Sequence, residues 1–123
     1  MENLKSPVTE AELAGKAVKP RVTVCDVEDA IAGEYYFTPA EAVESYAGEQ
    51  IPTFPSMHIF TICVLVLQNG FIVTGESACA DPENYNAEIG MRIARKNAVD
   101  KIWPLLGYQL KDKLHAEWNG EQV

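Results

Sequence analysis

Residues 57–80 read MHIFTICVLVLQNGFIVTGESACA, two strand-like apolar runs joined by Asn69-Gly70. Asn-Gly between two such runs is the strongest short-range signal for a β-hairpin, because both residues tolerate the positive φ of tight turns. The sequence therefore predicts two antiparallel strands, at about 57–68 and 71–80.

The register and environment of the hairpin follow from the same residues. A two-residue turn would place Val66 opposite Val73 and Cys63 opposite Glu76. Both alternating faces of the first run are apolar, whereas a strand wetted on one side alternates apolar with polar residues. The pattern therefore favours a sheet that is covered on both faces.

A long helix is predicted directly after the hairpin, over about 82–103. Asp81 suits the N-cap and Pro82 the first helical position, whereas Pro104 would kink or end the helix. A stripe of small residues follows, at Ala87, Gly90 or Met91, Ala94 and Ala98. Small residues let a helix lie close to a sheet, and Gly75 and Ser77 would supply a matching shallow surface.

Shorter helices are predicted on either side of this block. Thr23 or Asp26 would cap a first helix whose apolar face comprises Val27, Ile31 and Tyr35. A second helix would open at Thr38-Pro39 and end near Ala47-Gly48. After Gly107, a C-terminal helix would carry a stripe made of Leu110, Leu114 and Trp118.

These elements define an α+β fold in a single domain at 21–118. Residues 1–20 are predicted to form a flexible N-terminal arm with one helical turn at 9–15, and residues 119–123 a tail. A chain of 123 residues is long enough for one core. Because a two-stranded sheet is marginal in water, we expect self-association to complete it, as a dimer or higher homo-oligomer.

The charge is strongly acidic and unevenly distributed. The chain holds 10 Lys and Arg against 18 Asp and Glu, and the first 50 residues hold ten acids and four bases. This balance makes nucleic-acid binding unlikely, because phosphate contacts need a basic surface. It suits solubility, a basic host protein as partner, or mimicry of the charge of DNA.

The cysteines and the hydropathy bound the setting of the protein. Cys25, Cys63 and Cys79 have no CxxC spacing, and an odd number of cysteines favours reduced thiols in a cytosolic setting. The longest apolar run, residues 59–67, is about half the length that a membrane-spanning helix needs. No membrane association is therefore predicted.

No catalytic, metal or cofactor site is predicted. The two histidines, His58 and His115, lie outside any recognisable motif, and catalysis needs a nucleophile with an orienting base. The sequence around Ser77 lacks the second glycine of an esterase nucleophile elbow. Capping and surface pairing account for Asp81 and Glu88 without a metal ion.

A cationic cluster on the long helix is the candidate binding site. Helix N-termini favour anions, and an aromatic ring there would stack on a base. The predicted ligand-binding residues are Asn84, Tyr85, Arg92, Arg95, Lys96 and Phe54. A small phosphate-bearing nucleotide would suit them. The alternative is a solvated helix face, in which Glu88 and Asp100 pair with the cations at four-residue spacing.

Several stretches together resemble a phage family. They are YYFTPAEAV at 35–43, TICVLVL at 61–67, NGFIVTGESACADPENYNAEIG at 69–90 and IARKNAVDKIWPLLGYQL at 93–110. Across roughly 22–114 the chain resembles small tailed-phage and prophage proteins named after gene forty-nine of one enterobacterial podovirus and gene sixty-six of another. The resemblance implies an accessory protein that acts in the host bacterial cytoplasm, and it transfers no active site.

Three functions are compatible with these observations. The first is a non-enzymatic phage protein that counters host antiviral defence by binding and sequestering a small nucleotide-type signal. The second is an acidic, DNA-mimic-like inhibitor that binds a host defence protein. The third is a structural or replication accessory protein with no small ligand.

Overall fold

The computed structural model describes residues 7–16 and 20–118 of the chain. Its helices are α1 (Glu10–Lys16), α2 (Val24–Asp29), α3 (Pro39–Ala47), α4 (Ala87–Asp100) and α5 (Ile102–Glu117), with short 3₁₀ helices η1 (Pro55–His58) and η2 (Pro82–Asn84). Its strands are β1 (Ile31–Phe37), β2 (Phe60–Leu67) and β3 (Ile72–Ala78). The fold is α+β, as predicted. Residues 1–6 and 17–19 of the expected arm and the expected tail at 119–123 lie outside the described residues.

The predicted hairpin is present as β2 and β3, but its register differs by one residue. Leu65 pairs with Val73 and Cys63 with Gly75, rather than with Thr74 and Glu76. The turn contains three residues, because the Gly70 N–H bonds the Leu67 carbonyl and the Leu67 N–H bonds the Phe71 carbonyl. Gly70 has φ +89°, which is typical of the glycine that closes a three-residue hairpin loop.

The sheet has a third strand that the sequence pattern assigned to a helix. The first helix ends at Asp29, and β1 then pairs antiparallel with β2, with Tyr35 opposite Val64. The strand order is β1-β2-β3, so β2 is central. Gly33 weakens a helix at this point, and Ile31, Tyr35 and Tyr36 are residue types that suit a strand. Pairing with β2 supplies the hydrogen bonds of the strand backbone. The sheet is therefore completed within one chain, and self-association stays a prediction.

Helix α4 packs on one face of the sheet at unusually close range. Gly75 of β3 lies against the α4 backbone, and a Cβ at this position would overlap the Ala94 carbonyl oxygen and the Ala98 nitrogen. Ala94 and Ala98 are fully buried. The predicted small-residue stripe therefore forms the contact between helix and sheet, and Gly75 supplies the shallow surface expected for it.

Only that face of the sheet is covered. Along β2, burial alternates strictly: Thr61, Cys63, Leu65 and Leu67 face α4 and are buried. The other face carries half-exposed and exposed side chains, centred on Phe60, Ile62, Val64, Val66, Tyr35 and Ile72. We call it the open face. No helix of the described part of the chain lies across it, so these residues do not supply the second cover that the pattern favours, and cover by a second copy stays a prediction.

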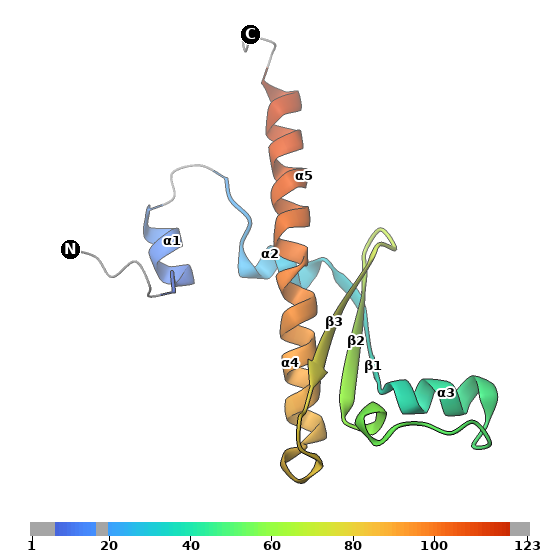
Figure 1. Ribbon diagram of the computed structural model, residues 1–123. Helices are drawn as coiled ribbons and strands as arrows, with labels where there is room; N and C mark the ends of the chain where they lie inside the picture. Colours follow the sequence, from blue (N-terminus) through green and yellow to red (C-terminus); the bar gives the residue numbers. More distant parts are fainter. Residues whose placement is uncertain (1–6, 17–19, 119–123) are drawn as a thin grey trace.

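Helices α4 and α5 follow one another as a single long rod (Figure 1). The break between them falls at Lys101 rather than at Pro104, so the predicted helix at 82–103 ends early. In a helix that continued unbroken from α4, Pro104 would have no N–H to donate to the Asp100 carbonyl, and its ring would clash with that carbonyl. Because the break falls at Lys101, Pro104 lies in the first turn of α5, where a missing N–H is tolerated. The C-terminal helix thus begins before Gly107.

The N-terminal helices are capped as the sequence predicts. The Thr23 hydroxyl accepts from the Asp26 N–H at 3.1 Å, and the Asp26 carboxylate accepts from the Thr23 N–H at 2.9 Å, which forms a capping box. Thr38 caps α3 by accepting from the Glu41 N–H. Gly48 ends α3 with φ 78°. In Figure 1, α3 extends sideways from the end of the sheet, away from the α4–α5 rod.

The core lies between the sheet, α4 and α2. It consists of Val27, Cys63, Leu65, Leu67, Val73, Ala94, Ala98 and Ile102. Val27 is the one buried side chain of α2, so α2 closes the end of the layer between α4 and β1. Burial of these side chains is the main stabilising term of the fold.

Substitution of Gly75 tests the close contact between α4 and the sheet. We expect Gly75→Ala to lower the free energy of unfolding by about 3 kcal/mol or more, since the new methyl group meets backbone that cannot rotate away. Gly107→Ala is the control, because a Cβ there meets nothing within 4 Å. It should stabilise α5 by about 0.5–1 kcal/mol. Urea unfolding of both variants measures the difference, and a neutral Gly75→Ala would contradict the contact.

Candidate functional site

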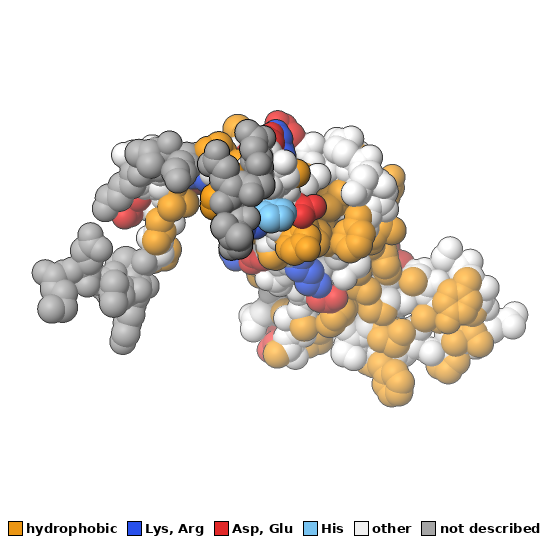
Figure 2. All heavy atoms as spheres, turned by 90° about the horizontal axis from the view of Figure 1, so that it is seen from above, with side chains coloured by type: hydrophobic (Ala, Val, Ile, Leu, Met, Phe, Trp, Pro, Cys, Tyr) orange, Lys and Arg blue, Asp and Glu red, His pale blue; other side chains and the backbone are white. Residues whose placement is uncertain are grey.

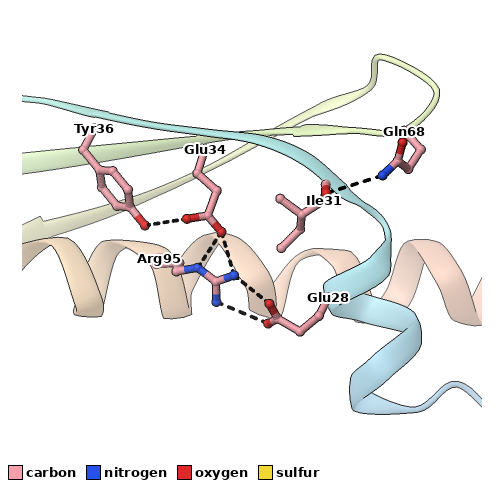
Figure 3. A network of polar contacts seen from close by, with 6 residues as sticks. All are labelled: Glu28, Ile31, Glu34, Tyr36, Gln68 and Arg95. Atoms are coloured by element: carbon pink, nitrogen blue, oxygen red, sulfur yellow. Dashed lines mark hydrogen bonds and ion pairs between the residues drawn. The ribbon is translucent and has the colours of Figure 1, made fainter.

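Arg95 is the centre of a polar network that joins three elements (Figure 3). Its guanidinium donates to both carboxylate oxygens of Glu28 on α2, at 2.7 and 3.2 Å. It also donates twice to one oxygen of Glu34 on β1, at 2.9 and 2.7 Å. The Tyr36 hydroxyl extends the network by donating to the second oxygen of Glu34 at 3.4 Å. Arg95 therefore fastens α4 to α2 and to the edge strand β1.

The electrostatics of this network match its geometry. The hydrogen bonds that Arg95 donates to Glu28 and then to Glu34 raise the pKa of Arg95 above its usual value. The hydrogen bond from Arg95 lowers the pKa of Glu28 below its ordinary value. Burial, with smaller contributions from Cys63 and Glu34, raises the pKa of Tyr36 to about 12. Two carboxylates thus face one guanidinium, and the network carries a net negative charge at neutral pH.

The other two cations of the predicted cluster are also paired with acids. Arg92 lies 3.5 Å from Glu88 and Lys96 lies 3.0 Å from Asp100, both pairs four residues apart on the exposed side of α4. Such exposed pairs contribute little to stability. With Arg95 engaged as well, α4 presents balanced charge rather than a cationic surface, which favours the solvated-face alternative.

Asn84 and Tyr85 lie before α4 rather than in its first turn. Asn84 ends η2, which Asp81 caps by accepting from the Glu83 N–H. Asn86 is the N-cap of α4 and accepts from the Ile89 N–H at 3.1 Å. Phe54 precedes η1 on a different loop and is 74% exposed. The six predicted residues are therefore spread over three separate segments, and only the three cations of α4 share one element.

Tyr85 belongs to a small cavity at the start of α4. The cavity has a volume of about 90 Å³, with Tyr36, Thr61 and Met91 among its walls. Gly90 leaves the space that Thr61 occupies, because a Cβ there would lie 2.9 Å from the Thr61 hydroxyl. That hydroxyl is buried and has no hydrogen-bond partner in the described part of the chain. Space of this size suits a few water molecules rather than a nucleotide.

A much larger hollow lies at the opposite end of the sheet, between α2, the β2–β3 turn and α5. We call it the α2–α5 groove, and its volume is about 690 Å³. It is lined by Arg21, Val22, Asp26, Asp29, Ala30, Leu67, Gln68, Asn69, Leu106, Gln109, Leu110 and Lys113. Pockets that hold small molecules have volumes of this order.

Hydrogen bonds between α2 and the hairpin turn hold one wall of the groove. The Gln68 side-chain amide donates to the Asp29 carbonyl at 3.1 Å, and the Gln68 N–H donates to the Ala30 carbonyl at 2.9 Å. Arg21 is fixed by an ion pair of 3.0 Å with Glu10 of α1. Lys113 has no ion-pair partner among the described residues. The groove thus combines apolar side chains with amides, carboxylates and Lys113, which has no ion pair with residues 7–16 or 20–118.

The groove escapes prediction from sequence because its residues come from three distant segments, at 21–30, 67–69 and 106–113. The spacing of Leu106, Leu110 and Lys113 on one face of α5 is the one local signal for it. In the view of Figure 2, hydrophobic side chains gather on the side of the molecule away from α1, with few charged side chains among them.

Within residues 7–16 and 20–118, no three His, Cys, Asp or Glu side chains come together in a way that could hold a metal ion. The cysteines are free thiols; Cys63 is buried, as expected for a small apolar residue, and burial raises its pKa. None of the helices described is long and apolar enough to cross a membrane.

Comparison with known proteins identifies the family. A sequence model of phage proteins matches residues 22–114, which include every strand and α2 to α4. The chain belongs to the phage protein (N4 Gp49/phage Sf6 gene 66) family. A search of curated proteins finds no match, and a search of solved structures finds none either.

Removal of the Arg95 guanidinium tests its structural role. We expect Arg95→Gln to lower the free energy of unfolding at pH 7 by about 1–2 kcal/mol, since it breaks charged hydrogen bonds that are partly open to solvent. Arg92→Gln, in an exposed pair, should change it by less than about 0.5 kcal/mol.

The pH dependence of the same variants separates an ion-pair effect from a packing effect. The pKa of Glu28 is lowered in the folded protein, so its contribution is present above 4.5, its ordinary value, and is lost as the pH falls through the folded pKa. The stability gap between wild type and Arg95→Gln should therefore narrow in acid. A gap that is equal at pH 7 and pH 3 would show that the guanidinium acts by packing alone.

Proposed function

We propose that this phage protein is non-enzymatic and counters host antiviral defence by binding and sequestering a small nucleotide-type signal in the α2–α5 groove. The observation that carries the proposal is the groove itself, which at about 690 Å³ matches the size of small-ligand pockets. Family membership supplies the phage setting. The proposed place of action is the cytoplasm of the infected bacterium.

The lining of the groove offers a partner for each part of a nucleotide. Lys113 at the rim suits a phosphate group, which lysine binds as a point charge. Asp29 on α2 is a suitable acceptor for ribose hydroxyls, since carboxylates take this role in other nucleotide sites. Leu67, Leu106 and Leu110 provide an apolar surface for the flat face of a base.

The groove supports ligand binding better than the cationic cluster predicted on α4. A phosphate bound to Arg95 would have to displace two carboxylates from bonds as short as 2.7 Å. Lys113 needs no such displacement within the described residues. We therefore transfer the proposed nucleotide site from α4 to α5 and keep the ligand class.

The geometry around the histidines is consistent with a non-enzymatic role. His58 Nε2 lies 3.1 Å from the Thr53 hydroxyl in an exposed segment between α3 and β2. Activation of a hydroxyl nucleophile needs a base that is itself oriented by a third group. The described hydrogen bonds give His58 no such group, so the pair is better explained as a contact that fixes the loop.

The acidic-inhibitor alternative gains less from the structure. Two of the acids that motivate it are engaged internally, since Asp26 caps α2 and Glu28 binds Arg95. Fewer carboxylates are then free to imitate a regular array of phosphates. We keep this function as the second candidate because the first 50 residues still carry an excess of six acids.

Calorimetry with defined nucleotides tests the proposal. We expect the purified protein to bind one or more of ADP-ribose, cyclic ADP-ribose and cyclic dinucleotides. Lys113→Glu should weaken that binding at least tenfold, because it replaces an attractive charge with a repulsive one, and tenfold corresponds to about 1.4 kcal/mol.

Lys111→Glu provides a matched control on the same helix, since Lys111 is exposed and does not line the groove. It should change the affinity by less than about threefold at physiological salt, where distant charges are screened. Failure of the wild-type protein to bind any of these probes would reject the proposed function. Equal losses in the two variants would reject the groove as the site.

A further inference from the structure

The open face of the sheet is an apolar surface that the fold leaves uncovered. Tyr35 of β1 is 60% exposed and Ile72 of β3 is 55% exposed, on either side of the half-exposed Val64 of β2. The Tyr35 ring lies over Gly33, where a Cβ would come within 3.1 Å of it. This face is therefore formed by flat rings and branched side chains that stand on a three-stranded sheet.

The open face also lacks charge, in a protein of net charge −8. Among the strand positions that alternate onto this side, Glu76 is the one residue that is charged at neutral pH, and it lies on the edge strand β3. Two copies of a chain with this net charge repel one another on average. Apart from Glu76, the open face brings no acids of the strands together.

The dimensions of the face suit a partner sheet. At about 3.3 Å per residue and 4.8 Å between strands, eight residues by three strands give an outline of about 26 by 14 Å, or roughly 370 Å². The largest apolar patch of a typical monomer has about this size and often has a function. The outline is smaller than the roughly 800 Å² per partner of a standard interface, so a dimer in exchange with monomer is expected.

We propose that the open face is a self-association surface, on which a second copy of the chain packs its own open face to form a two-layered β-sandwich. Sheets that stack in this way lie about 10 Å apart with interdigitated side chains. An isologous contact places the same apolar residues on both sides, so that no complementary surface is needed elsewhere. The partner sheet supplies the second cover that the apolar alternation of β2 requires. The α2–α5 groove lies on the other side of the sheet and stays accessible.

Sedimentation velocity over a concentration series tests this inference. Wild-type protein should shift from monomer towards dimer as its concentration rises. Val64→Lys places a charge at the centre of the face and should leave the protein monomeric throughout. Ile72→Lys, at a more exposed position, should weaken the dimer at least tenfold. It replaces Val64→Lys as the test if Val64→Lys disturbs folding.

Ile93→Lys is the control, because Ile93 is a 46% exposed residue of α4 that lies outside the open face. It should dimerise like the wild type. Wild-type protein that remains monomeric up to about 1 mM, the weak end of measurable affinities, would overturn the inference and leave the face for a different protein partner. A dimer unaffected by Val64→Lys and Ile72→Lys would show that another surface associates. Val64→Lys and Ile72→Lys should still bind the nucleotides that the wild type binds. Loss of the dimer with binding retained therefore tests the open face independently of the proposed function.

Discussion

The contact between the α4 backbone and Gly75 is the constraint on which the rest of this structure depends. Because no side chain separates helix from sheet at this point, Ala94 and Ala98 can be fully buried against β3. This approach fixes the height of α4 above the sheet, and so brings Arg95 within hydrogen-bond distance of Glu34 on β1 and Glu28 on α2. One missing methyl group thereby sets both the core and the polar network beside it.

The same contact divides the molecule into two functionally different sides. On the side of α4, Arg95 pairs with Glu28 and Glu34. The α4–α5 rod extends past the sheet, and α5 forms the α2–α5 groove together with α2 and the β2–β3 turn. Opposite α4, no helix of residues 7–16 and 20–118 covers the sheet, and Glu76 is the one charged residue of the strands on that side. The proposed ligand site and the proposed self-association surface thus lie on opposite sides of the sheet, so that the two proposals are compatible.

Sequence patterns predict the parts of this fold that are encoded locally. Asn69-Gly70, the caps at Thr23 and Thr38, and the small residues that meet Gly75 all lie close to the elements they specify. Strand β1 was missed because Val27, Ile31 and Tyr35 fit a helical spacing, whereas the partner of Tyr35 is Val64. Glu34 and Glu28, which accept hydrogen bonds from Arg95, lie 61 and 67 residues away from it in the sequence. The cationic residues of α4 therefore suggest a binding site, but acids from distant parts of the chain pair with Arg95 in the folded protein. The groove combines three segments that are far apart in the sequence.

The central claim is that α4 and the sheet form one cooperative unit held by the Gly75 contact. Native-state hydrogen exchange of backbone amides in increasing urea tests it most directly. The account predicts that amides of β2, of β3 and of α4 around Ala94 and Ala98 exchange in one step, with the same free energy and urea dependence. Exchange of the α4 amides through a separate opening of lower free energy, while those of the sheet remain protected, would contradict it.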